Sequence, residues 1–403
     1  MFHLKQDVMP EKKEITEDSS FHEEYMRMAI ELAKKGCGRV NPNPMVGAVI
    51  VKDGNVIGSG YHTRYGRMHA EREAFASLKN PGDAEGADLY VTLEPCCHRG
   101  KQPPCTEAIV EHGIKRVFIG SSDPNPLVAG KGIAMLREHG VQVTEQVLKE
   151  ECDALNEVFF HYIQSKRPYV VMKYAMTMDG KIATVSGKSR WITGEIARRH
   201  VHEDRNRYMA IMVGIQTVLK DDPMLNCRLE NGRDPVRIVC DSHLRIPENS
   251  RLVQSAGEIP LWIAAVRPDN TELLREKQLM EHQIRAERLE RAGCRILYTD
   301  ADARGHVNLI QLMDLLGKEG IDSILLEGGA GIHESSLQCR IVNKVQVYIA
   351  PKLFGGRDAA SPVGGQGVDE PDQAWILSEP VITKLGADLL LESEVIYPCL
   401  QES

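Results

Sequence analysis

The chain has few aromatic residues, no excess of positive charge and no long apolar run. Aromatic residues make up 5% of its 403 residues, and 49 Lys and Arg stand against 57 Asp and Glu, giving a net charge of -8. This acidic balance argues against a protein that grips a nucleic-acid backbone. The apolar run at 45–51 is far shorter than the roughly 20 residues of a bilayer span, and the first 20 residues contain no signal-peptide core. We therefore expect a cytoplasmic protein with no nucleic-acid or membrane partner.

A disulfide framework is not expected either. The sequence contains ten cysteines, and most of them are lone and widely separated. Free cysteine is commonly buried, so we interpret these as reduced, buried thiols: Cys37, Cys152, Cys227, Cys240, Cys294, Cys339 and Cys399. The exception is the cluster of Cys96, Cys97 and Cys105.

The length predicts two or three domains, because a domain usually has roughly 100 to 200 residues. Residues 1–18 are charged and unpatterned and form an N-terminal extension. Ser20 and Glu23 make a capping box that would begin a helix ending at Gly36. Pro168 ends a long helical pattern, and a strand-rich run follows it. The predicted domains are therefore 19–165 and 166–403.

Strand and helix patterns alternate in both domains, which indicates α/β architecture, with three layers in the first. The dipeptide Asp53-Gly54 predicts a β-hairpin between 45–51 and 56–57. In the first domain we expect helices at 26–33, 70–78, 106–112, 132–139 and 147–163, and strands at 88–93, 116–120 and 141–144. In the second we expect strands at 169–175, 210–213, 236–240, 261–265, 295–298, 323–326 and 344–349, and helices at 195–207, 271–276, 309–318 and 331–337.

His69, Cys96 and Cys105 are the first candidates for metal binding. His69 begins one predicted helix, Cys96 follows a strand, and Cys105 precedes another helix. One imidazole and two thiolates would give zinc three protein ligands and leave a fourth position for water, as in catalytic sites. Glu71, two residues from His69, could take a proton from that water and pass it to a leaving amine. Zinc-dependent base deaminases have this pattern, H-x-E followed by P-C-x-x-C.

Alternatives to this interpretation remain open. Eight residues separate Cys96 from Cys105 instead of two, so HAE beside buried cysteines could be a chance arrangement. Cys97 could compete as a ligand, but adjacent side chains point apart, and we interpret it as structural. A nucleic-acid base deaminase, such as a tRNA-editing enzyme, would need a basic, aromatic-rich surface. A non-catalytic zinc protein would have no need of Glu71.

The second domain has one nucleotide-binding candidate of its own. A predicted strand ends in Glu327-Gly328-Gly329-Ala330-Gly331 before a helix, where glycine amides and a helix N-terminus suit a phosphate. The sequence is not the GxGxxG fingerprint. A tight turn or a helix cap would explain these glycines as well.

Several segments resemble the bifunctional riboflavin biosynthesis family, which joins a diaminohydroxyphosphoribosylaminopyrimidine deaminase to a 5-amino-6-(5-phosphoribosylamino)uracil reductase. The long spacer between the cysteines is a mark of that family, and the matches cover nearly the whole chain from about residue 20. The family usually has a small polar residue at Cys97, threonine at Gln102, and serine or threonine at Gly194. The matching segments are 43–47 (NPMVG), 69–71 (HAE), 93–105 (LEPCCHRGKQPPC), 123–126 (DPNP), 173–181 (KYAMTMDGK), 189–193 (SRWIT), 214–228 (GIQTVLKDDPMLNCR), 327–329 (EGG) and 350–353 (APKL).

The resemblance implies the fold and two reactions. It implies an α/β protein with an N-terminal cytidine-deaminase-like three-layer α/β/α domain and a C-terminal dihydrofolate-reductase-like α/β domain. Zinc-dependent deamination of 2,5-diamino-6-(5-phosphoribosylamino)pyrimidin-4(3H)-one would give 5-amino-6-(5-phosphoribosylamino)uracil, and NADPH would then reduce its ribosyl group to ribityl. One Zn²⁺ per deaminase domain, NADPH, small phosphoribosylaminopyrimidine substrates and a homo-oligomer, dimer or tetramer, are implied. NADPH over NADH rests on the resemblance alone.

The resemblance also assigns residues in the deaminase domain. Asn43, His62 and Glu71 would hold the pyrimidine, while three further residues would line the ribose-phosphate side, namely Lys101, Asp123 and Asn125. An amide can read a pyrimidine edge, and a lysine can meet a phosphate. A solvated loop position would equally explain His62 and Lys101, and turn formation would explain Asp123 and Asn125.

In the reductase domain the resemblance assigns two sets of residues and two catalytic candidates. The set that would contact NADPH is Ala175, Trp191, Thr217, Asp221, Gly329, Ala330, Gly331, Ile332, His333, Glu334 and Ser335. The set that would contact the substrate is Ser189, Arg205, Leu225, Arg228 and Glu327, in which the two arginines suit a phosphate. Hydride transfer to the sugar C1 needs proton supply nearby, for which Asp221 and Lys173 are the candidates. Asp221 could instead be a turn former.

Overall fold

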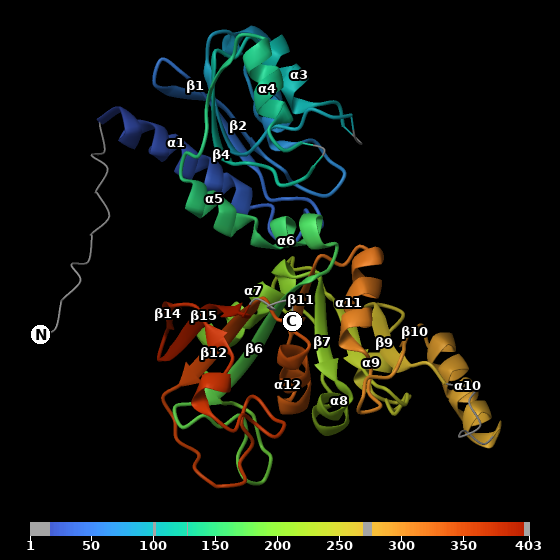
Figure 1. Ribbon diagram of the computed structural model, residues 1–403. Coiled ribbons are helices and arrows are strands. Elements are labelled where there is room, and N and C mark those ends of the chain that lie inside the picture. The colour runs from blue at the N-terminus through green and yellow to red at the C-terminus, as the bar shows by residue number, and fades with distance from the viewer. Residues whose placement is uncertain (1–16, 100–101, 127, 269–275, 399–403) are drawn as a thin grey trace, which may run out of the picture. The chain divides into compact units, whose positions relative to one another are not determined.

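The computed structural model describes residues 17–99, 102–126, 128–268 and 276–398 (Figure 1). The described chain forms two compact units, the first from 17–36 and 44–157 and the second from 37–43 and 158–398. Each unit is built on its own sheet. The division into two functional domains at residue 165 stays a prediction. No helix among the described residues is long and apolar enough to cross a membrane.

The first unit contains a five-stranded sheet in the order β2-β1-β3-β4-β5. Strand β1 is antiparallel to β2 and β3, whereas β3, β4 and β5 are parallel. Asp53 and Gly54 have φ angles of 50° and 75°, which confirms the predicted two-residue hairpin turn. The strands are β1 (Gly47–Lys52), β2 (Asn55–Tyr61), β3 (Asp88–Leu93), β4 (Arg116–Ser121) and β5 (Gln142–Thr144).

Helices cover both faces of this sheet, because its buried strands are apolar on both sides. Ile50 packs with Phe75 and Ile109 on one face, and Val49 packs with Met26 on the other. The three-layer architecture is therefore confirmed. The helices are α1 (Glu17–Lys34), α2 (Ala70–Ala76), α3 (Cys105–Glu111), α4 (Lys131–Glu138) and α5 (Lys149–Leu155), with a 3₁₀ turn at Pro81–Ala84.

The second unit contains a ten-stranded sheet in the order β10-β9-β8-β7-β11-β6-β12-β15-β13, with β14 paired to β15 (Figure 1). The strands from β10 to β12 are parallel, and β15 is antiparallel to β12. The strands are β6 (Tyr169–Thr177), β7 (Ala210–Gly214), β8 (Val236–Cys240), β9 (Leu261–Val266), β10 (Arg295–Thr299), β11 (Ser323–Leu326), β12 (Lys344–Ala350), β13 (Ile376–Leu377), β14 (Val381–Leu385) and β15 (Asp388–Ile396).

Two apolar layers cover the faces of this sheet. Leu312 and Leu316 pack on one face with Met212, and Leu252 packs on the other with Val213. The helices are α6 (Glu157–Ser165), α7 (Glu195–Arg207), α8 (Ile215–Asp221), α9 (Arg251–Gln254), α10 (Glu276–Arg291), α11 (Leu309–Lys318) and α12 (Ala330–Gln338), with a 3₁₀ turn at Pro371–Gln373.

The expected single helix at 147–163 is wrong, because the chain forms α5 and α6 with a break at Asn156. The Asn156 side chain accepts a hydrogen bond from the Met45 backbone N at 2.8 Å and donates one to the Met45 carbonyl at 2.9 Å. This tertiary contact replaces helix continuity.

Two other helix predictions differ from the structure. Helix α1 begins at Glu17, so Ser20 lies inside it instead of capping it; helix ends are the least certain part of a sequence pattern. The helix expected at 271–276 lies almost entirely outside the described residues, and α10 begins where that prediction ended.

Candidate functional site

The residues His69, Cys96 and Cys105 lie together in the first unit. His69 is the N-cap of α2, and Cys105 is the first residue of α3. The Nδ1 atom of His69 lies 3.5 Å from Cys96 Sγ and 3.4 Å from Cys105 Sγ, and the three ligand atoms lie within 4.8 Å of one another. One nitrogen and two sulfur donors at this separation fit a tetrahedral zinc site with one open position.

Backbone hydrogen bonds close the base of the spacer between the two cysteines. Cys105 N and Thr106 N donate to the Cys96 carbonyl at 3.1 and 3.2 Å. Hydrogen bonds from Cys105 and His69 lower the pKa of Cys96 to about 4. Cys96 is therefore a thiolate at neutral pH, the form that binds metals.

Glu71 lies two residues after His69, in the first turn of α2. Its side chain is buried, and burial raises the pKa of its carboxyl group, with Cys96 adding to the effect. A carboxyl group with a raised pKa holds a proton more readily than an ordinary carboxyl group, which suits proton transfer. The structure therefore places a candidate proton carrier beside the predicted metal ligands.

His62 and Asp123 are both buried in this unit. His62 Nδ1 donates to the Met68 carbonyl at 2.9 Å, and its ring centroid lies 5.7 Å from that of His69, so His62 is close to the metal ligands and is not a solvated loop residue. Burial lowers the pKa of His62 and raises that of Asp123 to about 6. Asp123 Oδ1 also accepts from Asn125 N at 2.8 Å, so the expected turn is present.

Two predicted substrate residues are not placed at this site. Lys101 lies outside the described residues. Asn43 belongs to the segment 37–43, which groups with the second unit, and its backbone N donates to the Val40 carbonyl at 2.9 Å. Their roles stay predictions.

The sequence analysis assigned no role to Glu94. Its side chain holds the backbone of the loop that carries Asp123. Its buried carboxylate accepts hydrogen bonds from the backbone N of Gly130 at 3.0 Å and of Gly132 at 3.1 Å. Longer bonds come from Asp123 N and Ile133 N, both at 3.4 Å. The available signal was its place in LEPC, two residues before the predicted metal ligand Cys96.

Gly132 allows a close approach to the metal-binding segment. A Cβ at this position would lie 2.2 Å from the Pro95 carbonyl oxygen, which no side chain tolerates. Glycine here lets the start of α4 pack directly against the residue that precedes Cys96.

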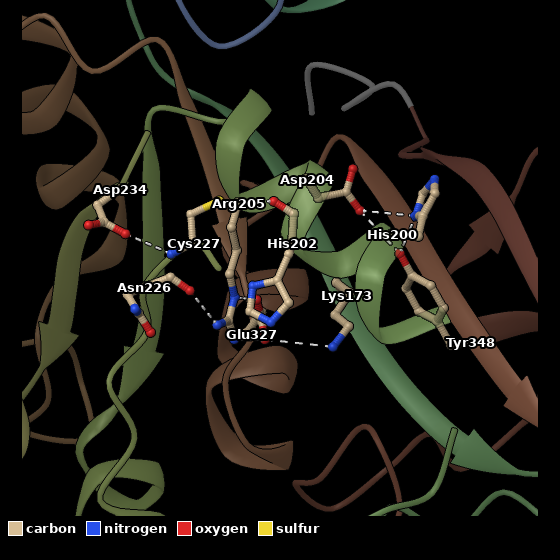
Figure 2. A network of polar contacts seen from close by, with 10 residues as sticks. All are labelled: Lys173, His200, His202, Asp204, Arg205, Asn226, Cys227, Asp234, Glu327 and Tyr348. Atoms are coloured by element: carbon tan, nitrogen blue, oxygen red, sulfur yellow. Dashed lines mark hydrogen bonds and ion pairs between the residues drawn. The ribbon is translucent and has the colours of Figure 1, made fainter. Parts of the chain in front are cut away.

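Lys173, Arg205 and Glu327 form a charged cluster in the second unit (Figure 2). They come from β6, α7 and the residue after β11. Arg205 Nε and Nη2 donate to the two Glu327 oxygens at 2.8 and 3.0 Å, and Lys173 Nζ lies 3.6 Å from Glu327 Oε2. Burial would raise the pKa of Glu327, but Arg205 and Lys173 lower it to about 2.

A second set of polar contacts adjoins this cluster. Lys173 Nζ lies 5.5 Å from the centre of the Tyr348 ring, a cation–π distance. The Tyr348 hydroxyl donates to Asp204 Oδ2 at 3.1 Å, and His200 Nδ1 lies 2.8 Å from the same hydroxyl. Arg205 Nη1 donates to the Asn226 carbonyl at 2.9 Å. The Arg205 guanidinium is therefore held on two sides within the protein, and its phosphate contact stays a prediction.

The glycine-rich segment after β11 leads into α12. Among the described residues no side chain caps this helix, and a Cβ at Gly331 would meet no described atom within 4 Å. Bare amides at a helix N-terminus suit a phosphate of NADPH. A Cβ at Gly329 would lie 3.7 Å from Thr217 Oγ1, so two residues expected at the cofactor are neighbours.

Later residues of the same segment face inward. His333 is buried with Nδ1 donating to the Pro362 carbonyl at 2.8 Å. Glu334 accepts two hydrogen bonds from Arg304, both at 3.1 Å. The start of α12 is therefore the better placed part for a cofactor contact.

The other expected reductase residues are spread over several elements. Trp191 is 61% exposed, and the Arg198 guanidinium lies 4.6 Å from its ring centre. Asp221 ends α8, and its carbonyl accepts from Arg190 Nη2 at 3.2 Å. The remaining four are Ala175 on β6, Ser189 in the loop before α7, the buried Leu225 and the exposed Arg228. No contact described here tests their individual roles.

The first unit has three layers and places a His-Cys-Cys cluster beside a buried glutamate. The second unit has a mostly parallel sheet with a candidate phosphate-binding turn. Together these features define a two-domain deaminase and reductase. Comparison with known families agrees. Residues 19–121 match the family described as cytidine and deoxycytidylate deaminase zinc-binding region, and residues 168–391 match the RibD C-terminal domain.

Full-length relatives cover nearly the whole chain. The riboflavin biosynthesis protein RibD of Actinobacillus pleuropneumoniae is 53% identical over 93% of this chain and 96% of its own length. That of Escherichia coli is 39% identical over 92% and 98%. The crystal structure of a diaminohydroxyphosphoribosylaminopyrimidine deaminase/5-amino-6-(5-phosphoribosylamino)uracil reductase from Thermotoga maritima is 37% identical, with a TM-score of 0.78 over 94% of this chain and all of that one.

The chain belongs to the RibD family of bifunctional riboflavin biosynthesis proteins. Its two-domain α/β fold, its deaminase and reductase domains and its small-molecule substrate class are thereby confirmed, as are zinc and NADPH as cofactors.

Proposed function

We propose that the two units catalyse consecutive reactions on one phosphorylated pyrimidine. The first unit hydrolyses the 2-amino group of 2,5-diamino-6-(5-phosphoribosylamino)pyrimidin-4(3H)-one. The second reduces the ribosyl group of the resulting aminouracil phosphate with NADPH, which gives 5-amino-6-(5-phosphoribitylamino)uracil. The observation that carries the proposal is that one chain contains two separate clusters. One has a buried glutamate beside it and consists of His69, Cys96 and Cys105. The other consists of Lys173, Arg205 and Glu327.

In the deaminase site, His69, Cys96 and Cys105 hold the zinc ion. Bound zinc supplies the acidity that makes water a nucleophile near neutral pH. Glu71 takes a proton from the attacking water and delivers it to the exocyclic nitrogen, so that a C–O bond forms, the C–N bond breaks and ammonia leaves. The raised pKa of Glu71 suits this exchange, because the carboxyl group must hold the proton between the two transfers.

The substrate is held on two sides of the metal in this proposal. His62 reads the pyrimidine with Asn43, and its position beside His69 supports the assignment. Asp123 and Asn125 contact the ribose, and Lys101 meets the phosphate. Glu94 positions Asp123 by fixing the loop backbone.

In the reductase site, NADPH supplies the hydride to the sugar C1. The amides of Gly329, Ala330 and Gly331 bind a cofactor phosphate, with Thr217 beside them. Lys173 and Asp221 are the candidates for supplying the proton that the reduced sugar takes up. Lys173 has the more fixed side chain of the two, because Glu327 and the Tyr348 ring hold its Nζ.

We also propose a cytoplasmic homo-oligomer, a dimer or a tetramer. The strands at the end of the second sheet support an interface there, since Val381 and Ile382 are 66% and 62% exposed and exposed apolar edge strands favour association. Light scattering coupled to gel filtration should show an oligomer that Ile382→Lys dissociates. A monomeric wild type would contradict the proposal.

The deciding experiment follows ammonia release and NADPH absorbance separately in zinc-loaded protein given the diaminopyrimidinone phosphate. Wild type should release ammonia and then consume NADPH. Glu71→Gln should abolish ammonia release but still reduce preformed aminouracil phosphate. If wild type releases no ammonia from this substrate, the proposed function is wrong.

A further inference from the structure

His202 lies within the reductase cluster, although no sequence motif selected it. It stands three residues before Arg205 on α7, a spacing that places two side chains on one helix face. Figure 2 shows its imidazole beside the Arg205 and Glu327 pair. The backbone carbonyl of His202 also accepts from the Cys227 thiol at 3.5 Å, which ties this part of α7 to the loop that carries Leu225 and Arg228.

The two ring nitrogens of His202 have different surroundings. Nδ1 is enclosed by protein and has no hydrogen-bond partner among the described residues, whereas Nε2 is not among the side-chain atoms of those residues that are both enclosed and unpartnered. An enclosed N–H without an acceptor is unfavourable, so the proton belongs on Nε2. The ring then presents an N–H donor at Nε2.

The charged neighbours keep the ring in this form. Burial lowers the pKa of His202 to about 4, and Arg205, Arg228 and Lys173 act in the same direction, while Glu327 opposes them. At neutral pH the imidazole therefore carries no charge and remains a single N–H donor. It adds hydrogen-bonding capacity to the cluster without adding to its positive charge.

The surrounding groups indicate what this donor meets. The charged groups that act on His202 are Arg205, Arg228 and Lys173 against the carboxylate of Glu327. The surroundings of the ring are therefore net positive and suit a phosphorylated ligand. An N–H in such a place needs an acceptor oxygen. We propose that His202 donates a hydrogen bond from Nε2 to an oxygen of the aminouracil phosphate and so helps to determine its binding in the reductase site. This inference rests on the proposed reductase function.

The test compares variants of the full chain with preformed aminouracil phosphate and NADPH. His202→Ala should raise KM for the aminouracil phosphate roughly tenfold, about the effect of one lost hydrogen bond, with little change in kcat or in KM for NADPH. His202→Gln, which keeps an N–H donor, should remain within about threefold of wild type. His282→Ala is the matched control, since His282 also has an enclosed unpartnered ring nitrogen among the described residues but lies on α10.

A second readout does not depend on turnover. In protein labelled with ¹⁵N-histidine, the Nε2–H signal that His202→Gln removes should shift when aminouracil phosphate is added without NADPH. An unchanged KM in His202→Ala, or an unperturbed Nε2 signal, would overturn the inference while leaving the proposed function intact. If wild type does not reduce aminouracil phosphate at all, both fall together.

Discussion

The two sites of this protein are assembled in different ways. The deaminase cluster takes its three predicted metal ligands from 37 residues of sequence, His69 to Cys105, at the starts of two helices and shortly after one strand. The reductase cluster joins Lys173, Arg205 and Glu327, the first and last of which lie 154 positions apart in the sequence. The first site is therefore a local motif, while the second exists only because β6 and β11 are neighbours in the sheet.

The sites also differ in how burial acts on their carboxyl groups. Glu71 is buried, and burial together with Cys96 raises its pKa more than His69 lowers it. Glu327 is buried between two cations, and its pKa is lowered to about 2. The same residue type is thus predicted to carry a proton in one site and is held as an anion in the other.

The largest effect should come from breaking the metal cluster. Cys105→Ser removes a thiolate ligand, so zinc content should fall toward zero and ammonia release should become undetectable, because activation of water depends on the metal. Reduction of preformed aminouracil phosphate should continue, because the reductase cluster shares no ligand with this site. Metal analysis and both assays measure these outcomes.

Cys97→Ser is the matched control for the metal cluster. Cys97 is adjacent to a ligand, but we interpret it as structural, so this variant should keep its zinc and its deaminase activity. Loss of one zinc equivalent from Cys97→Ser would show that the ligand set is wrong.

The next largest effect should come from Glu327→Gln. Neutralising one buried partner leaves Arg205 and Lys173 without their counter-charge, which usually costs about 3–5 kcal/mol of stability. Reductase activity should fall by roughly 100-fold, and ammonia release should be unchanged. Denaturant unfolding and the two separate assays provide the measurement.

Glu319→Gln is the comparison for Glu327→Gln. Arg295 donates two hydrogen bonds to Glu319, at 2.6 and 2.8 Å, but this pair lies on the surface. An exposed pair contributes about 1 kcal/mol or less. Equal destabilisation by the two substitutions would refute the importance of burial at Glu327.

A smaller effect is expected at Glu94. Glu94→Gln keeps the side-chain volume but replaces one accepting oxygen with a donor that faces backbone N–H groups, so the Asp123 loop should loosen. We expect KM for the diaminopyrimidinone phosphate to rise about tenfold with zinc content unchanged. The exposed Glu111 on α3 serves as control, and Glu111→Gln should match wild type. A loss of zinc from Glu94→Gln would instead make Glu94 a support of the metal site.

The smallest effect is a change in the pH dependence of stability at Asp204. Burial raises the pKa of Asp204 to about 6, above its ordinary value of 3.8. A raised carboxyl pKa means that the folded state binds the proton more tightly, so the contribution of Asp204 to stability falls as pH rises from about 4 to about 6. Asp204→Asn should therefore gain stability relative to wild type over that interval.

Urea unfolding at several pH values measures this difference between Asp204→Asn and wild type. The half-buried Asp314, paired with Arg167 at 2.6 Å, gives a reference substitution, Asp314→Asn, that should show no such gain. A constant difference between Asp204→Asn and wild type from pH 4 to 7 would argue against a raised Asp204 pKa.

The contrast between local and distributed sites explains how much could be predicted from sequence. The hairpin at Asp53-Gly54 and the grouping of His69, Cys96 and Cys105 were predictable, because turn chemistry and ligand spacing are short-range signals. The break at Asn156 was not, since it depends on Met45, 111 residues away. Glu94 and His202 were passed over for a similar reason: their roles depend on backbone amides and cations that only the fold brings to them.

The separation of the two sites is tested most directly by removing zinc from wild type with a chelator, then restoring it, while ammonia and NADPH are followed separately. Ammonia release from the diaminopyrimidinone phosphate should disappear and return, whereas reduction of preformed aminouracil phosphate should stay constant throughout. Loss of reduction together with deamination in intact, folded protein, or deamination that survives complete zinc removal, would contradict the account.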